Sequence, residues 1–128
     1  MGNKEKGASS ERELLHLFWQ RGFAVIRAAG SGMLPEPSCD LLVGKGDRKY
    51  AIECKTARID KKYLNKKQIE NLKRFAGIFG LKPFVAIKFL RQEWYFISPD
   101  KLEKTGKGLA ISLEEIKKIG KSFEQFVK

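Results

Sequence analysis

The sequence is poor in residues that could cross-link a fold or bind zinc. Its 128 residues include only two cysteines, one histidine and four prolines. Two cysteines are too few for a disulfide scaffold, and a single histidine argues against a zinc site or histidine-based catalysis. Apolar runs such as residues 84–87 are far shorter than the roughly 18 residues of a membrane span. We therefore expect no membrane association.

The N-terminal segment also lacks a targeting signal. Residues 1–10 are polar and contain no apolar stretch of the kind that secretory signals carry. We expect a cytoplasmic protein, in which Cys39 and Cys54 stay reduced and pack as ordinary core residues.

Negative charge is scarce. The chain has 15 Asp and Glu against 26 Lys and Arg, a net charge of +11 with the histidine neutral. The hydrophobic content of 42% and the nine phenylalanines exclude a disordered polyelectrolyte. The charge excess indicates a polyanionic partner, with nucleic acid first. The alternative is the lysine-rich surface of a protein from a hot or salty cell.

Hydrophobic periodicity predicts one α/β domain with a mixed sheet and helices on its faces. Residues 1–8 are predicted as a flexible basic arm, and 9–128 as the single domain. A helix capped by Ser9 or Ser10 is expected to end at Gly22. A second helix is predicted from Asn65, with Gly80 as its C-cap. The predicted strands are residues 23–26, 40–43, 50–56, 84–90 and 94–97, with a short edge strand at 109–112 and a short helix at 112–119.

Charged residues interrupt the apolar pattern of the third strand. Alternation places Ala51, Glu53 and Lys55 on one face of this strand. Asp40 opens the preceding strand, and a hairpin centred on residues 44–47 brings Asp40 near Glu53. Two close carboxylates are costly unless a cation lies between them, and Mg²⁺ or Mn²⁺ prefers such oxygen ligands. By itself, Glu53-x-Lys55 also fits a cross-strand salt bridge on a half-exposed sheet.

Glu11 begins the apolar stripe of the first helix. It shares a face with Leu14, Leu15 and Phe18. At this point the spacing leaves two alternatives open. Glu11 is either a partner of the helix dipole or a residue directed at a site.

The segments 6–15 and 22–31, with Asp40 at a strand start and Glu53-Cys54-Lys55 in the next strand, resemble archaeal-type Holliday-junction resolvases. These enzymes belong to the PD-(D/E)xK nuclease superfamily. The resemblance covers most of residues 6–97. It implies a restriction-endonuclease-like fold with a central mixed five-stranded sheet flanked by helices, and an endonuclease that makes paired symmetric nicks in four-way DNA junctions.

The resemblance also implies a catalytic set of Glu11, Asp40, Glu53 and Lys55. Asp40, Glu53 and the backbone carbonyl of Cys54 would hold Mg²⁺, with Mn²⁺ as a substitute. Glu11 would complete the metal shell directly or through water, and Lys55 would orient or activate the attacking water. Cys39 stands where the family has the proline of its motif, which affects the expected loop conformation more than the chemistry.

The candidates for DNA contact divide into two groups. Arg27 and Ser31 match family positions near the scissile phosphate, and Arg12 is similar to a basic position of the family beside the acidic residue of the first helix. The remaining candidates for DNA contact belong to the N-terminal arm or to the flank of the second helix: Lys4, Lys6, Lys61, Lys62, Lys66 and Lys67.

A homodimer suits the two-fold symmetry of junction cleavage, with Phe75 and Phe79 as candidate interface residues. The alternative is that both rings pack on the sheet. The resemblance further implies a nucleoid-associated protein, or one in the host cytoplasm if viral. Two other functions stay open: another nuclease of the superfamily, such as a repair or restriction-like enzyme, and a basic DNA-binding module without catalysis.

Overall fold

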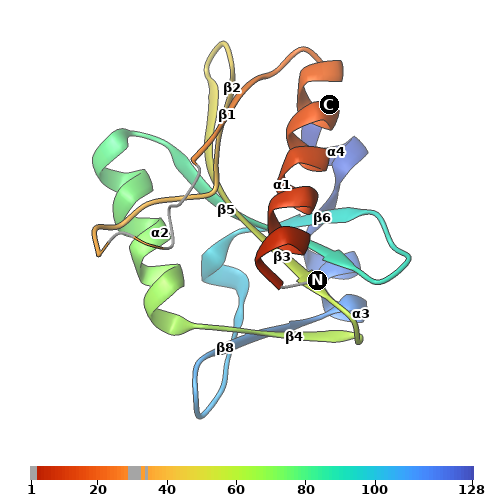
Figure 1. Ribbon diagram of the computed structural model, residues 1–128. Coiled ribbons are helices and arrows are strands. Elements are labelled where there is room, and N and C mark those ends of the chain that lie inside the picture. Colours follow the sequence, from red (N-terminus) through yellow and green to blue (C-terminus); the bar gives the residue numbers. More distant parts are fainter. Residues whose placement is uncertain (1–2, 29–32, 34) are drawn as a thin grey trace.

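A six-stranded mixed sheet forms the centre of the molecule (Figure 1). The computed structural model describes the backbone of residues 3–6 and all atoms of residues 7–28, 33 and 35–128. The strands, in their order across the sheet, are β1 (Ala24–Arg27), β2 (Leu41–Lys45), β3 (Arg48–Ala57), β5 (Lys82–Phe89), β6 (Trp94–Ile97) and β9 (Lys121–Ser122). Only the β3–β5 pair is parallel among these described strands.

A smaller three-stranded sheet lies beside the main one. It pairs β4 (Lys61–Leu64) with β8 (Leu109–Ser112), and β8 with β7 (Glu103–Lys104), all antiparallel. The helices are α1 (Asn3–Gln20), α2 (Lys66–Phe79), α3 (Leu113–Ile119) and α4 (Phe123–Val127), with a short 3₁₀ turn, η2, at Pro99–Lys101.

The helices cover the two faces of the main sheet. On one face, α1 and α4 contribute to a core that includes Leu14, Phe18, Ile52, Phe96 and Phe126. On the other face, α2 and α3 pack with the sheet through Ile69, Leu72, Val85, Ile87 and Ile116. The β5 strand is buried on both faces, which explains its nearly continuous apolar sequence.

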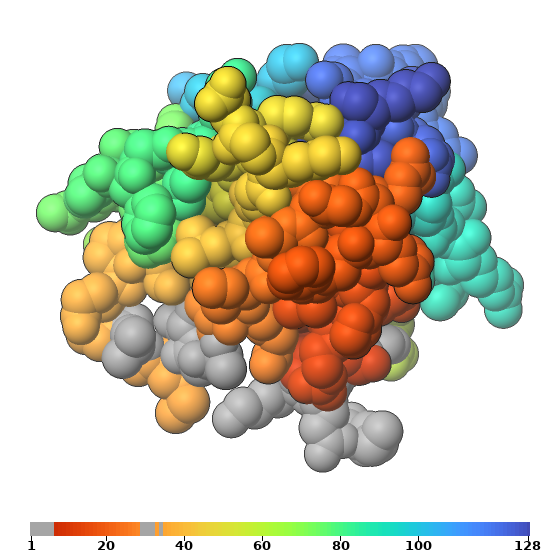
Figure 2. Space-filling view, turned by 90° about the horizontal axis from the view of Figure 1, so that it is seen from above, coloured from red at the N-terminus to blue at the C-terminus, as the bar shows by residue number. Residues whose placement is uncertain are grey.

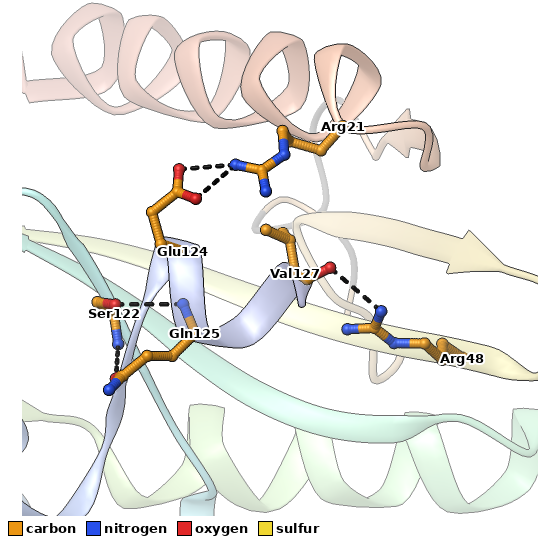
Figure 3. A network of polar contacts seen from close by, with 6 residues as sticks. All are labelled: Arg21, Arg48, Ser122, Glu124, Gln125 and Val127. Carbon is orange, nitrogen blue, oxygen red and sulfur yellow. Dashed lines mark hydrogen bonds and ion pairs between the residues drawn. The ribbon is translucent and has the colours of Figure 1, made fainter.

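The C-terminal residues close the α1 face. The Arg21 guanidinium forms an ion pair with the Glu124 carboxylate at 2.7 Å, and Arg48 Nη1 donates to the Val127 carbonyl at 3.2 Å. Ser122 and Gln125 form a capping box that starts α4 (Figure 3). Figure 2 shows α1 (orange), the β2–β3 hairpin (yellow) and the C-terminal segment (dark blue) meeting on one side of the molecule.

The predicted α/β architecture is confirmed, and the strand count differs. The main sheet has six strands rather than five because β9, only two residues long, adds to β6. The predicted edge strand at 109–112 is the middle strand of the smaller sheet, where it pairs with β4 and β7. The β4 strand was not predicted, since residues 61–64 were interpreted as a basic flank of the second helix.

The first helix starts earlier than the sequence predicts. It begins at Asn3 and not at Ser9 or Ser10, so residues 3–8, predicted as a flexible arm, are helical. Lysine, glutamate and alanine are favourable helix formers, and adding residues to an existing helix costs little compared with nucleating one. The second helix is confirmed with its predicted C-cap, Gly80, which is left-handed at φ 88°. Asn65, where the helix was predicted to begin, is its N-cap, and the Asn65 side chain accepts from the Gln68 backbone N–H.

Candidate active site

The β2–β3 hairpin fixes the position of the two central carboxylates. Its turn contains Gly46 at φ 61°, a left-handed conformation that glycine adopts without strain. The register places Leu41 opposite Ile52. The next pair beyond the ladder is therefore Asp40 and Glu53, as the sequence predicts.

Asp40 is held by backbone on two sides. Its own amide donates to the Ile52 carbonyl at 3.0 Å. One of its carboxylate oxygens, Oδ2, accepts from the Cys54 amide at 2.8 Å. These bonds fix the carboxylate at the end of β2, beside the β3 backbone.

Glu53 is a carboxylate in an unfavourable place. Its side chain is only 14% exposed. Burial and the nearby negative charge of Asp40 raise the pKa of Glu53 to about 8, although the positive charge of Lys55 acts in the opposite direction. A cation bound between the two carboxylates would offset both the cost of burying the Glu53 charge and its repulsion from Asp40.

The Lys55 ammonium lies between a carboxylate and an amide. Its Nζ is 3.6 Å from Glu53 Oε2, and it donates to Gln68 Oε1 at 2.9 Å. Gln68 belongs to the first turn of α2, where its backbone N–H donates to Oδ1 of the N-cap residue Asn65. Sequence reasoning missed Gln68. The only signal was its position three residues after Asn65, the predicted first residue of the helix, which locates Gln68 at a helix start but not beside Lys55.

Glu11 points toward this end of the sheet. Arg27 Nε donates to Glu11 Oε1 at 2.9 Å. Burial and the negative charge of Asp40 raise the pKa of Glu11, and Arg27 partly offsets them. Because α1 begins at Asn3, Glu11 lies more than two turns into the helix and the helix-dipole alternative is wrong.

The residues at this end fit a divalent cation only in part. Asp40, Glu53 and the Cys54 carbonyl offer the hard oxygen atoms that Mg²⁺ or Mn²⁺ binds. In the described ranges, no group of three or more His, Cys, Asp or Glu side chains is arranged to hold one ion. Glu11 is instead paired with Arg27. Mg²⁺ usually keeps several waters and is held by one or two carboxylates together with substrate phosphates, so the two carboxylates of Asp40 and Glu53 are enough for it.

The predicted DNA-contacting residues lie in different places. Arg12, Lys66 and Lys67 are exposed, whereas Lys61 and Lys62 are half-buried on β4. Ser31 and the side chains of Lys4 and Lys6 lie outside the described residues.

The two phenylalanines of α2 behave differently. Their rings are 5.5 Å apart. Phe75 packs partly against the core below α2, and Phe79 is 60% exposed. The alternative in which both rings pack on the sheet is therefore wrong for Phe79, which remains available for a contact outside the chain.

Both cysteines are free. Burial, together with the charge of Asp40, raises the pKa of the Cys39 thiol to about 12. Burial also raises the pKa of Cys54 well above its usual value. Both thiols therefore stay protonated and unreactive, as expected of core residues. No helix in the described part of the chain is long and apolar enough to cross a membrane.

Comparison with known proteins gives a consistent family. The family model described as archaeal Holliday junction resolvase (Hjc) matches residues 2–128. The chain is 44% identical over 122 residues to the crossover junction endodeoxyribonuclease Hjc of Methanocaldococcus jannaschii, covering 95% of this chain and 86% of the relative. It is 39% identical over 129 residues to the Hjc of Archaeoglobus fulgidus, covering 95% of each chain.

The fold agrees with a solved structure as well. The Hjc Holliday junction resolvase from Archaeoglobus fulgidus superposes with a TM-score of 0.88 at 36% identity, covering 95% of this chain and all of that chain. The chain belongs to the archaeal Holliday junction resolvase family.

Proposed function

We propose that this protein is an endonuclease that resolves four-way DNA junctions by metal-dependent phosphodiester hydrolysis. The observation that carries the proposal is the meeting of Asp40, Glu53 and Lys55 at one end of the sheet in a chain of net charge +11. A binding module gains nothing from buried carboxylates facing a phosphate. A hydrolase needs them to hold a cation.

Asp40, Glu53 and the Cys54 carbonyl would hold Mg²⁺, or Mn²⁺ in its place. When bound, the ion supplies a lowered pKa for coordinated water and polarises the phosphoryl oxygen. Lys55 places a positive charge beside Glu53, where it can orient water and stabilise negative charge that develops on the phosphate. Gln68 restricts the Lys55 ammonium to this position.

Glu11 and Arg27 form the other side of the site. Their ion pair is partly buried, with both side chains a quarter exposed or less. Glu11 accepts from Nε of the Arg27 guanidinium, and the group carries further N–H donors of the kind that suit a phosphate oxygen. Glu11 would complete the metal shell directly or through water, since the bond from Arg27 occupies only one of its two carboxylate oxygens.

A homodimer would supply the two sites that paired nicks require. The exposed side of α2 supports this part of the proposal, because Ile78 is 78% exposed and Phe79 60% exposed, beside the Phe75 ring. Sedimentation of the Phe75→Ala, Phe79→Ala double variant tests it. We expect a monomer, and an unchanged dimer would refute the assigned interface. Location in the cytoplasm with the nucleoid belongs to the same proposal.

The central experiment compares a labelled four-way junction with a linear duplex of the same sequence in Mg²⁺. We expect paired, symmetric nicks in the junction and an intact duplex. Equal cutting of both substrates would indicate another nuclease of the superfamily. Tight binding without cutting would indicate a non-catalytic module, and either result would overturn the proposal.

A further inference from the structure

A groove of about 780 Å³ opens directly from the candidate active site. Cys54 and Lys55 form one end of it, and its walls come from the end of β3, from β4, from the end of β5, and from Gly7 and Ser10 of α1. The groove thus continues past the catalytic end of β3, away from Asp40.

The lining of this groove is strongly basic. It includes six cationic side chains and no aspartate or glutamate: Lys55, Arg58, Lys61, Lys62, Lys88 and Arg91. Lys88 pairs with Glu13, and Lys61 lies 3.9 Å from Glu103. Within the part of the chain that the structure describes, no ion pair is found for Arg58, Lys62 or Arg91. Burial and the nearby charge of Lys55 lower the pKa of Lys62. This surplus of positive charge favours an anionic ligand.

Large apolar side chains lie exposed among these cations. Ile59 is 67% exposed, Tyr63 63% and Leu90 57%, and all three line the groove. The Lys61 ammonium is 5.4 Å from the centre of the Tyr63 ring. An exposed aromatic ring within a basic groove is the arrangement by which proteins bind single-stranded nucleic acid, with bases stacked on the ring and phosphates on the cations.

One residue in the groove lining has a left-handed backbone conformation. Arg91, in the turn between β5 and β6, is the only residue other than glycine with positive φ in the described ranges, at 62°. The Leu90 amide donates to the Ala57 carbonyl, which ties this turn to the end of β3. An arginine in a conformation that favours glycine, on the wall of a basic groove, indicates placement for a ligand.

We propose that this groove binds one or two unpaired nucleotides of the junction next to the cleaved phosphate, with a base stacked on Tyr63 and phosphates on Arg58, Lys62 and Arg91. The groove volume lies in the range of ligand pockets, which suits one or two nucleotides better than a whole duplex. This inference rests on the proposed function and adds a reason for selectivity. Nucleotides at a branch point unstack at lower cost than those in a linear duplex.

The test uses a four-way junction with 2-aminopurine at the branch point, in EDTA so that no cleavage occurs. We compare the unmodified protein with Tyr63→Ala, Tyr63→Phe and Trp19→Ala. Trp19 is a matched control because it is 53% exposed in the last turn of α1. Since Gly7 and Ser10 are the α1 residues that line the groove, Trp19 lies roughly 14 Å or more along the helix from it. Thermal unfolding checks that each variant is folded.

We expect Tyr63→Ala to weaken junction binding about fivefold or more and to abolish the 2-aminopurine fluorescence change. Tyr63→Phe should retain both, and Trp19→Ala should change neither. The Arg58→Ala, Arg91→Ala double variant should lower the slope of log affinity against log salt by about 1.4, the value for two single-strand phosphate contacts. Lys117→Ala, an exposed cation on α3, is the control for charge.

Two results would overturn the groove assignment. One is a Tyr63→Ala variant that binds the junction and alters the fluorescence as the unmodified protein does. The other is an equal loss of affinity for linear duplex, which would mean that the groove contacts paired DNA. Because binding is measured without metal, these outcomes are separate from the proposed function, which is tested by whether the unmodified protein cuts the junction and leaves the linear duplex intact in Mg²⁺.

Discussion

Replacing Glu53 by glutamine should stabilise the metal-free protein at high pH. The Glu53 carboxyl has a pKa near 4.5 in the unfolded chain, and burial together with Asp40 raises it to about 8 in the folded protein. At a pH between these two pKa values, Glu53 keeps its proton in the folded protein but has lost it in the unfolded chain. Stability therefore falls as pH rises from about 4.5 to 8.

The size of this loss follows from the shift. The rise in the pKa of Glu53 from 4.5 to about 8 lowers the free energy of unfolding at high pH by at most about 5 kcal/mol, because each pKa unit corresponds to about 1.4 kcal/mol. Glutamine keeps the shape and cannot ionise, but it also removes the partner of Lys55, which stays hydrogen-bonded to Gln68. We therefore expect Glu53→Gln to gain at least about 2 kcal/mol at pH 9, or roughly 8 °C in Tm for a chain of this length.

The assay is urea and thermal unfolding in EDTA at pH 5 and pH 9. Glu53→Gln and the unmodified protein should differ little at pH 5 and clearly at pH 9. Addition of Mg²⁺ should stabilise the unmodified protein, more at pH 9 than at pH 5, because the ionised carboxylate binds the cation. The variant should lose most of this response and all cleavage. Glu70→Gln, an exposed position on α2, is the matched control and should leave the pH dependence unchanged.

The reasoning is refuted by either of two results. If Glu53→Gln loses as much stability between pH 5 and pH 9 as the unmodified protein, ionisation of Glu53 is not the cause of the loss. If the variant is the less stable of the two at pH 9 in EDTA, the Lys55 ion pair outweighs burial and the charge of Asp40.

Three further predictions concern the same site. Asp40→Asn should abolish junction cleavage in Mg²⁺ and keep junction affinity within about twofold by gel shift, so cleavage near the original rate would show that the site is misplaced. Gln68→Ala should lower kcat with little change in KM, because it frees the Lys55 ammonium, while Gln68→Glu should restore the rate in part; an unaltered kcat in Gln68→Ala would contradict a positioning role. Arg27→Ala should raise the pKa of Glu11 further, since only the positive charge of Lys55 then opposes burial and the negative charge of Asp40. Its cleavage should therefore require higher pH than that of the unmodified protein, and a shift to lower pH would reverse the assigned sign.

Local signals predicted the elements that carry their own boundaries. The α2 helix was found with both ends because its apolar residues recur with helical spacing and Gly80 is a strong C-cap residue. The Asp40–Glu53 pairing was found for a similar reason, since a tight turn fixes hairpin register within a few residues.

Elements that depend on distant partners were missed. The β4 strand contains two lysines in four residues and becomes a strand because it pairs with β8, more than forty residues later. The β9 strand is too short for any periodicity and exists because it pairs with β6. The start of α1 was predicted too late because the capping sequence at Ser10, which lies inside the helix, was interpreted as the N-terminus of the helix.

The same distinction explains which functional residues could be recognised. Asp40 and Glu53 were visible because carboxylates at apolar strand positions contradict the packing rule, and such local conflicts concentrate at functional sites. Gln68 and Tyr63 contradict nothing: a glutamine on an exposed helix face and a tyrosine on an edge strand are ordinary surface residues. Their importance arises only when α2 and β4 fold back beside the end of β3. Catalytic groups that break a local rule can thus be found from a single sequence, whereas groups that orient them or bind the substrate require the fold.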